Sequence, residues 1–169
     1  MQKRTLGLLF LLISLTALVA AQTAAPTGVS SLATAKFAPM DGLPSCMALS
    51  VLHGDPGKGP AAILLKSDSG CVVPWHWHTA NEQLILAHGT AIVEMKGAKP
   101  MPMKPGDYVY LPAKGIHRFT ATSQVLLYDV IDGAFDIHYV DAAGKEIPAD
   151  KALAATTQAK PAPSPAPKQ

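Results

Sequence analysis

The sequence predicts an all-β fold, a sandwich or small barrel built of short strands. Glycine and proline contribute 13 and 15 of the 169 residues and aromatic residues only 6%, which favours many turns between short strands. Strand-like runs also recur at short spacing along the middle of the chain. No stretch there has the apolar spacing of an amphipathic helix, apart from a weak alanine-rich segment at 150–159. Helix content should therefore be small.

The first 21 residues have the layout of a secretory signal peptide. Lys3 and Arg4 precede an apolar run over 6–20, and the small residues Ala20 and Ala21 follow it. A membrane-spanning helix needs about 20 apolar residues, and this run ends sooner. No cysteine follows the run closely, which disfavours a lipid anchor. We expect cleavage after 1–21, export to a bacterial periplasm or otherwise secretion, and no membrane association afterwards.

The mature chain divides into a central domain and two simple ends. Apolar residues make up 49% of the sequence, the level of a globular protein with one core. Residues 22–38 are mostly Ala, Thr, Ser and Pro and are expected to form a mobile leader. Residues 152–169 end in alternating prolines, which predicts a disordered Pro/Ala-rich tail. The domain should then occupy residues 39–151.

The charge of the chain excludes two classes of partner. The formal net charge is +2, and Lys3, Arg4, Lys160 and Lys168 lie in the terminal segments. The central domain has no basic excess, so neither nucleic acid nor an anionic membrane surface is an expected partner.

Each break between the expected strands contains turn-forming residues. Examples are the glycine- and proline-rich stretch 54–60, the stretch 104–107, and the pair Asp132 and Gly133. In 90–96, pointing Glu94 toward solvent sends Ala91 and Val93 to the core, because side chains alternate along a strand. The expected strands are 47–52, 61–67, 72–78, 82–87, 90–96, 108–111, 117–121, 125–131 and 135–140.

Potential metal ligands are concentrated in one segment. His76 and His78 are two positions apart, so on a strand they project from the same face. The stretch 79–81 is long enough to turn the chain, which lets Glu82 open the neighbouring strand beside them. His117 begins a later strand after a turn and is the candidate for the fourth ligand. For the His-x-His pair alone, two half-buried strand histidines bonded to backbone would be the ordinary interpretation, and Glu82 and His117 favour a metal instead.

These residues resemble the cupin family. Its first motif is a glycine, five residues, His-x-His, three residues, a glutamate, six residues and a glycine. Every fixed position of that motif is matched here, by Gly70, His76, His78, Glu82 and Gly89.

The second cupin motif is matched less completely. It runs glycine, five residues, Pro-x-Gly, two residues, histidine, three residues, asparagine. Gly106, Pro112 and His117 fit it, the inner glycine is displaced to Gly115, and Ala121 replaces the asparagine. The ligand spacing survives, but the turn before His117 is expected to differ.

The resemblance implies a small jelly-roll barrel and a metal site, without fixing a reaction. Three imidazoles and one carboxylate suit a divalent Fe, Mn, Ni, Co, Cu or Zn ion. The leading expectation is an enzyme with dioxygenase- or decarboxylase-like chemistry on a small phenolic or carboxylate ligand, with Glu82 as ligand and catalytic proton acceptor. A non-catalytic metal-dependent binding or sensory module is the alternative. Because cupin-like barrels often pair through exposed strand edges, a homodimer is also expected.

The walls of the metal pocket are expected to be largely apolar. If Glu82 and His117 point inward, strand alternation carries Leu84, Leu86 and Phe119 with them. Tyr108 and Tyr110 are candidates for a hydroxyl that orients a ligand, although alternation does not say which of them faces the barrel, and ordinary strand packing is the alternative.

Cys46 and Cys71 are the two cysteines of the chain. In an oxidising compartment they could form a disulfide that contributes about 3 kcal/mol. Two buried free thiols, or Cys71 as a soft metal ligand, are the alternatives. The remaining histidines, His53, His88 and His138, are expected at the surface or in structural roles.

Overall fold

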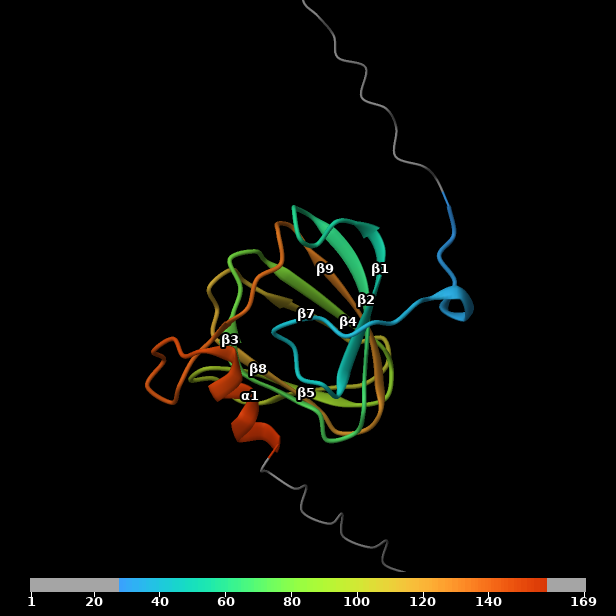
Figure 1. The fold of residues 1–169 in the computed structure, drawn as a ribbon. Coiled ribbons are helices and arrows are strands. Elements are labelled where there is room, and N and C mark those ends of the chain that lie inside the picture. Colours follow the sequence, from blue (N-terminus) through green and yellow to red (C-terminus); the bar gives the residue numbers. More distant parts are fainter. Residues whose placement is uncertain (1–27, 158–169) are drawn as a thin grey trace, which may run out of the picture.

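The computed structural model describes residues 28–157 and consists mostly of β-strands (Figure 1). A short 3-10 turn, Leu32–Thr34, precedes the strands, and one helix, α1 (Ala149–Thr157), follows them. The strands are β1 (Met47–Gly54), β2 (Ala61–Ser67), β3 (Val72–Trp77), β4 (Glu82–His88), β5 (Ala91–Met95), β6 (Met101–Met103), β7 (Tyr108–Leu111), β8 (His117–Ala121), β9 (Val125–Ile131) and β10 (His138–Tyr139).

The strands form two antiparallel five-stranded sheets, so the all-β prediction is confirmed. Sheet A has the order β1-β2-β9-β4-β7 and sheet B the order β10-β3-β8-β5-β6. Neighbours in each sheet are mostly distant in sequence, so the chain crosses repeatedly between the sheets, as a jelly roll requires. The two sheets face each other across one core (Figure 1).

The core is built from alternate residues of both sheets. In β9 of sheet A, Val125, Leu127 and Ile131 are buried, and in sheet B the same holds for Ala91 and Val93, as the alternation predicts. Burying a large apolar side chain of this kind stabilises the fold by roughly 1.5–3 kcal/mol.

Some strand boundaries differ from those expected. β6, which the sequence did not indicate, contains Pro102 and lies at the edge of sheet B, where a residue without an N–H group is tolerated. β3 ends at Trp77, one residue before His78. The last strand contains two residues, and Phe135 and Ile137 pack against the core outside it.

The two ends of the domain are more ordered than expected. Ala38, in the expected leader, forms an isolated bridge with Leu49. The tail boundary at 152 is wrong, because α1 runs on to Thr157 and packs against β3 and β10. Ala152 is buried in the core, and alanine is the best helix former. The expected signal peptide and the residues beyond 157 lie outside the described part of the chain, and within that part no helix is long and apolar enough to span a membrane.

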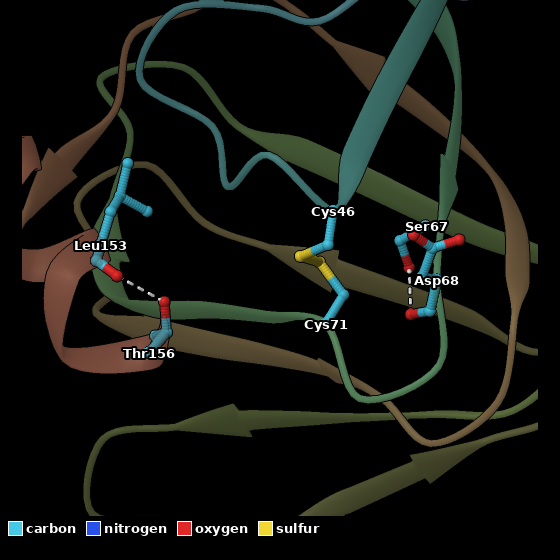
Figure 2. Close-up of a disulfide and its surroundings, with 6 residues drawn as sticks. All are labelled: Cys46, Ser67, Asp68, Cys71, Leu153 and Thr156. Carbon is cyan, nitrogen blue, oxygen red and sulfur yellow. Dashed lines mark hydrogen bonds between the residues drawn. A yellow bond between two sulfur atoms is a disulfide. The ribbon is translucent and has the colours of Figure 1, made fainter. Parts of the chain in front are cut away.

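Cys46 and Cys71 form a disulfide with an S–S distance of 2.07 Å (Figure 2). The bond joins the segment in front of β1 to the residue that precedes β3. Cys71 is buried, and its carbonyl accepts a hydrogen bond from Ala121 N at 2.9 Å. The bridge thus ties sheet A to sheet B close to the entry of the strand that carries His76.

Candidate metal centre

Three histidines converge inside the barrel. His76 lies near the end of β3, His78 follows that strand, and His117 is the first residue of β8. His76 and His117 are direct cross-strand partners in sheet B. All three side chains are buried, and one donor nitrogen from each lies within 4.8 Å of the other two. This spacing lets the three imidazoles reach a common centre.

An irregularity in β3 sets the direction of His76. The pairing with β8 shifts register between Val73 and His76, at Pro74 and Trp75. Such a bulge re-aims the residues after it, and proline is tolerated there because it has no N–H to pair. Trp75 lies under the Arg118 guanidinium, whose carbon is 4.9 Å from the indole centroid. The tryptophan therefore stays outside the centre, while His76 points into it.

Backbone carbonyls fix the tautomer of each imidazole. The Nδ1 of His76 bonds to Pro74 O at 2.6 Å and that of His117 to Gly115 O at 2.8 Å. The Nδ1 of His78 bonds to Asp136 O. A carbonyl only accepts, so each Nδ1 carries a proton, and the neutral imidazole then has its lone pair on Nε2. Three such nitrogens turned toward one centre form a ligand set for a cation.

The donor set fits a transition metal ion. His78 Nε2 is buried and has no hydrogen-bond partner among the described residues, a costly state that a bound cation would relieve. Neutral imidazoles beside a carboxylate suit divalent first-row ions. Burial and the neighbouring His117 and His78 hold the pKa of His76 well below its ordinary value of 6.5, which favours the unprotonated form that a metal needs.

Glu82 contacts two of the three histidines. It opens β4 in sheet A and is buried, and its Oε2 lies 3.6 Å from His78 Nε2 and 3.4 Å from His117 Nε2. The group of donors within 4.8 Å of one another contains the three histidines without Glu82. Burial alone would raise the pKa of Glu82, but His117 and the other imidazoles lower it to about 2. The carboxylate is thus ionised and available as an anionic ligand.

Hydrogen bonds from the loop after β9 hold the turn between His78 and Glu82. The Asp136 carboxylate accepts bonds from Thr79 N at 2.8 Å and Thr79 Oγ1 at 2.6 Å. The Asp132 carboxylate does the same for Asn81, at 2.8 Å from the backbone N and 2.6 Å from Nδ2. These side chains, which the sequence did not indicate as part of the site, fix the separation of two candidate ligands.

The turn before His117 was expected to differ from that of the motif, because the inner glycine is displaced to Gly115. The structure shows that it differs less than expected. Lys114 occupies the inner-glycine position of the second motif and has φ of 61°, the left-handed conformation that glycine adopts more readily. Gly115 does not take that conformation. It is required for space, because a Cβ there would lie 2.9 Å from Pro112 O. The turn therefore keeps the shape that the motif implies, and Lys114 N donates to His78 O at 2.8 Å.

A small cavity adjoins the four residues, and Leu84 and Phe119 line it as expected. Leu86 is in the core but not on the cavity wall. The volume of the cavity, counted as the space that the centre of a water molecule can occupy, is about 40 Å³. A single water needs about 10–15 Å³ on this measure, so the space holds about three waters.

Tyr108 and Tyr110 do not reach the cavity, so their interpretation as ligand-orienting hydroxyls is wrong. The pairing of β4 with β7 places them opposite Ile85 and Gln83, which alternate with the inward-facing Glu82. Their side chains are 56% and 51% exposed on the outer face of sheet A. Tyr108 Oη donates there to Gln83 Oε1 at 3.1 Å.

A second buried carboxyl, not predicted from the sequence, lies at the cavity. Asp129 lies in β9, paired with Leu84 of β4 and Ile63 of β2, and its side chain is 0% exposed. Burial, the negative charge of Glu82 and a hydrogen bond with Glu82 raise the pKa of Asp129 well above its ordinary value of 3.8. The available signal was strand alternation, which places Asp129 in the inner row between Leu127 and Ile131.

Residues 64–131 match the family described as Cupin domain, whereas no curated protein matches the chain. Similar solved structures include an acetylacetone dioxygenase from Acinetobacter johnsonii, with 18% identity, a TM-score of 0.57, and coverage of 80% of this chain and 95% of that one. An RmlC-like cupin protein from Ralstonia eutropha has 19% identity and a TM-score of 0.58, with coverage of 78% and 88%.

A DMSP lyase from Ruegeria pomeroyi has 23% identity and a TM-score of 0.51, with coverage of 60% of this chain and 57% of the lyase. The chain thus spans little more than half the length of that protein. At these identities the likeness concerns the fold, which is the cupin jelly roll. The family match and the neighbours together support a place in the cupin superfamily.

Proposed function

We propose that the protein is a metal-binding cupin in which His76, His78, His117 and Glu82 hold one divalent Fe, Mn, Ni, Co, Cu or Zn ion. The observation that carries the proposal is the common arrangement of the imidazoles. All three Nδ1 atoms bond to backbone carbonyls, and one donor nitrogen of each lies within 4.8 Å of the others. Glu82 contributes the negative charge that offsets part of the charge of a dication.

The proposed activity is that of an enzyme acting on a small phenolic or carboxylate ligand by dioxygenase- or decarboxylase-like chemistry. A bound redox-active ion would supply Lewis acidity and electron transfer. The pKa of Glu82, lowered to about 2, favours a role as anionic ligand over that of a strong proton acceptor. The solved neighbours include a dioxygenase and a lyase, and their shared fold supports a metal centre without selecting a reaction.

Elemental analysis of protein purified without added metal, followed by oxygen uptake with a panel of phenols and small carboxylates, tests this proposal. We expect about one equivalent of a redox-active metal and oxygen uptake with at least one compound. His53→Ala is the matched control for substitutions of the ligand histidines, because His53 lies in β1 away from the cavity. A wild-type protein that binds none of the six metals would contradict the proposed function.

The size of the cavity favours a second candidate, a non-catalytic metal-dependent binding or sensory module. Space for about three waters does not admit a phenol without side-chain movement. A stoichiometric zinc ion, with no turnover of any compound in the panel, would select this alternative.

Export to an oxidising compartment and a homodimer are further parts of the proposal. The Cys46–Cys71 disulfide supports export, because such bonds persist mainly in oxidising compartments. The edge strand β7 of sheet A, and the part of β1 that Ala38 does not cover, could pair with a second copy. Cell fractionation and light scattering test these two points.

A further inference from the structure

The described residues concentrate their unpartnered buried polar atoms in one place. Across residues 28–157, the buried side-chain nitrogen and oxygen atoms without a hydrogen-bond partner are His78 Nε2 and both carboxyl oxygens of Asp129. Both residues line the same cavity. A bound metal would account for His78. Glu82 lies within hydrogen-bond reach of Asp129, so a proton shared by these two carboxyls accounts for one Asp129 oxygen and leaves the other without a partner.

A buried carboxyl oxygen without a partner lowers the stability of the fold. Asp129 is fully buried in the middle of sheet A, and its inward neighbours along β9 are apolar. Transfer of a polar group from water into such surroundings costs several kcal/mol unless a hydrogen bond compensates it. A leucine at this position would match the rest of the inner row. The Asp129 oxygen that Glu82 does not engage is best explained by a partner that occupies the cavity.

The two sheets contribute different chemistry to the cavity. Sheet B and the residue that follows β3 supply the imidazoles of His76, His117 and His78. Sheet A supplies the carboxyls of Glu82 and Asp129, from adjacent strands β4 and β9. Glu82 pairs with Ile131 and Leu84 with Asp129, so the two carboxyls lie diagonally on the same inner face. A molecule between the sheets would meet the imidazoles on one side and the carboxyls of Glu82 and Asp129 on the other.

We propose that Asp129 binds an O–H group inside the cavity, belonging either to a water on the metal or to the hydroxyl of a small organic ligand. This inference rests on the proposed function, since it places the O–H group beside the metal. Water and a ligand hydroxyl share the chemistry that Asp129 recognises, and the cavity has room for both kinds of occupant only if the organic ligand is small.

Two variants and one control test the role of Asp129. Asp129→Leu replaces the two carboxyl oxygens with two methyl groups on the same branch atom, whereas Asp129→Asn keeps one acceptor oxygen. Ser67→Ala is the control, because Ser67 is another buried polar residue of sheet A that has a partner in Asp68 O and does not line the cavity. Each protein is measured without metal, with Co(II) alone, and with Co(II) plus glycolate or acetate, which differ by one hydroxyl.

Without metal, Asp129→Leu should raise the melting temperature by about 3–8 °C, because it removes a buried carboxyl that has an unpartnered oxygen. With Co(II), two results support the proposal and identify the source of the O–H group. A changed visible spectrum of Co(II) in Asp129→Leu, with no organic ligand added, indicates a water on the metal. The wild-type protein should prefer glycolate to acetate by about tenfold if Asp129 binds a ligand hydroxyl. Loss of this preference in Asp129→Leu, with an unchanged Co(II) spectrum, indicates that source. Asp129→Asn should retain part of either effect, and Ser67→Ala should show neither.

Failure of this inference can be distinguished from failure of the proposed function. If the wild-type protein does not bind Co(II), the metal centre itself is wrong. If all variants bind Co(II) with the wild-type spectrum and the wild-type ligand preference, the role of Asp129 is wrong and the metal centre stands. A lower melting temperature of metal-free Asp129→Leu would also overturn the inference, since it would show that the carboxyl stabilises the fold.

Discussion

Each imidazole of the candidate centre depends on one carbonyl oxygen for its orientation, and the three carbonyls come from different parts of the chain. Those of Pro74 and Gly115 lie two residues before His76 and His117, so the bulge and the turn aim these rings locally. The third belongs to Asp136, 58 residues from His78. His78 is therefore the ligand whose position depends most on correct folding of the rest of the barrel.

Removing a ring from the centre should abolish tight metal binding. His76→Ala or His117→Ala is expected to lower the metal content more than about tenfold, because even residues behind the ligands affect affinity by about tenfold or more. His53→Ala should leave it unchanged. Elemental analysis of the purified variants provides the measurement, and equal losses in all three would contradict the ligand assignment.

The metal-free protein should have an unusual dependence of stability on pH. The lowered pKa of His76 means that below pH 6.5 the unfolded chain binds a proton that the folded chain does not, so this residue makes stability fall on acidification. The raised pKa of Asp129 means that above pH 3.8 the folded chain keeps a proton that the unfolded chain loses, so this residue makes stability rise on acidification. Between pH 3.8 and pH 6.5 the contributions of His76 and Asp129 to the free energy of unfolding therefore oppose each other.

Asp129→Asn removes one of the two contributions. The free energy of unfolding of this variant without metal should fall by about 1.4 kcal/mol per pH unit below pH 6.5, and that of the wild type by less. Urea denaturation at several pH values between 7 and about 5 measures both slopes. Parallel profiles would show that Asp129 and His76 are not shifted in opposite directions.

At the level of elements, the sequence predicted which strands carry the site but not how the strands are bent. The motif spacing brought His76, His78, Glu82 and His117 together, because cross-strand neighbours depend mainly on strand order. The bulge in β3 was not predicted, since it depends on pairing with β8. Asp129 was missed because one acidic residue in an apolar strand resembles a solvent-facing position until the register is known.

The turn before His117 offers a direct test of backbone strain. Lys114 has φ of 61°, a conformation that costs a residue with a Cβ about 1–2 kcal/mol. Lys114→Gly should therefore raise the free energy of unfolding by about 0.5–1 kcal/mol, after the greater freedom of glycine in the unfolded chain is subtracted. Lys99→Gly is the control, because Lys99 is exposed and is not among the residues with positive φ. Thermal unfolding measures the stability of both variants. If Lys114→Gly and Lys99→Gly are destabilised equally, the backbone at Lys114 is not strained.

For the whole molecule, the disulfide is the main covalent constraint among the described residues. It closes a loop of 25 residues, for which reduced entropy of the unfolded chain predicts a stabilisation of about 3 kcal/mol. The double variant Cys46→Ser with Cys71→Ser should lose this amount in chemical denaturation and keep its metal content. Wild-type protein under reducing conditions should behave in the same way. Loss of metal without loss of stability would indicate that a cysteine acts as a ligand instead.

The division of donors between the sheets also affects how fast the centre can exchange its contents. Because both sheets supply ligands, a bound ion would connect them, with imidazoles from the side of sheet B and the Glu82 carboxylate from sheet A. Departure of the ion would then require the layers to separate transiently, a motion on the slow timescale of local unfolding. Dissociation should accordingly accelerate under conditions that loosen the barrel, and the centre should retain its metal long after free metal has been removed from solution.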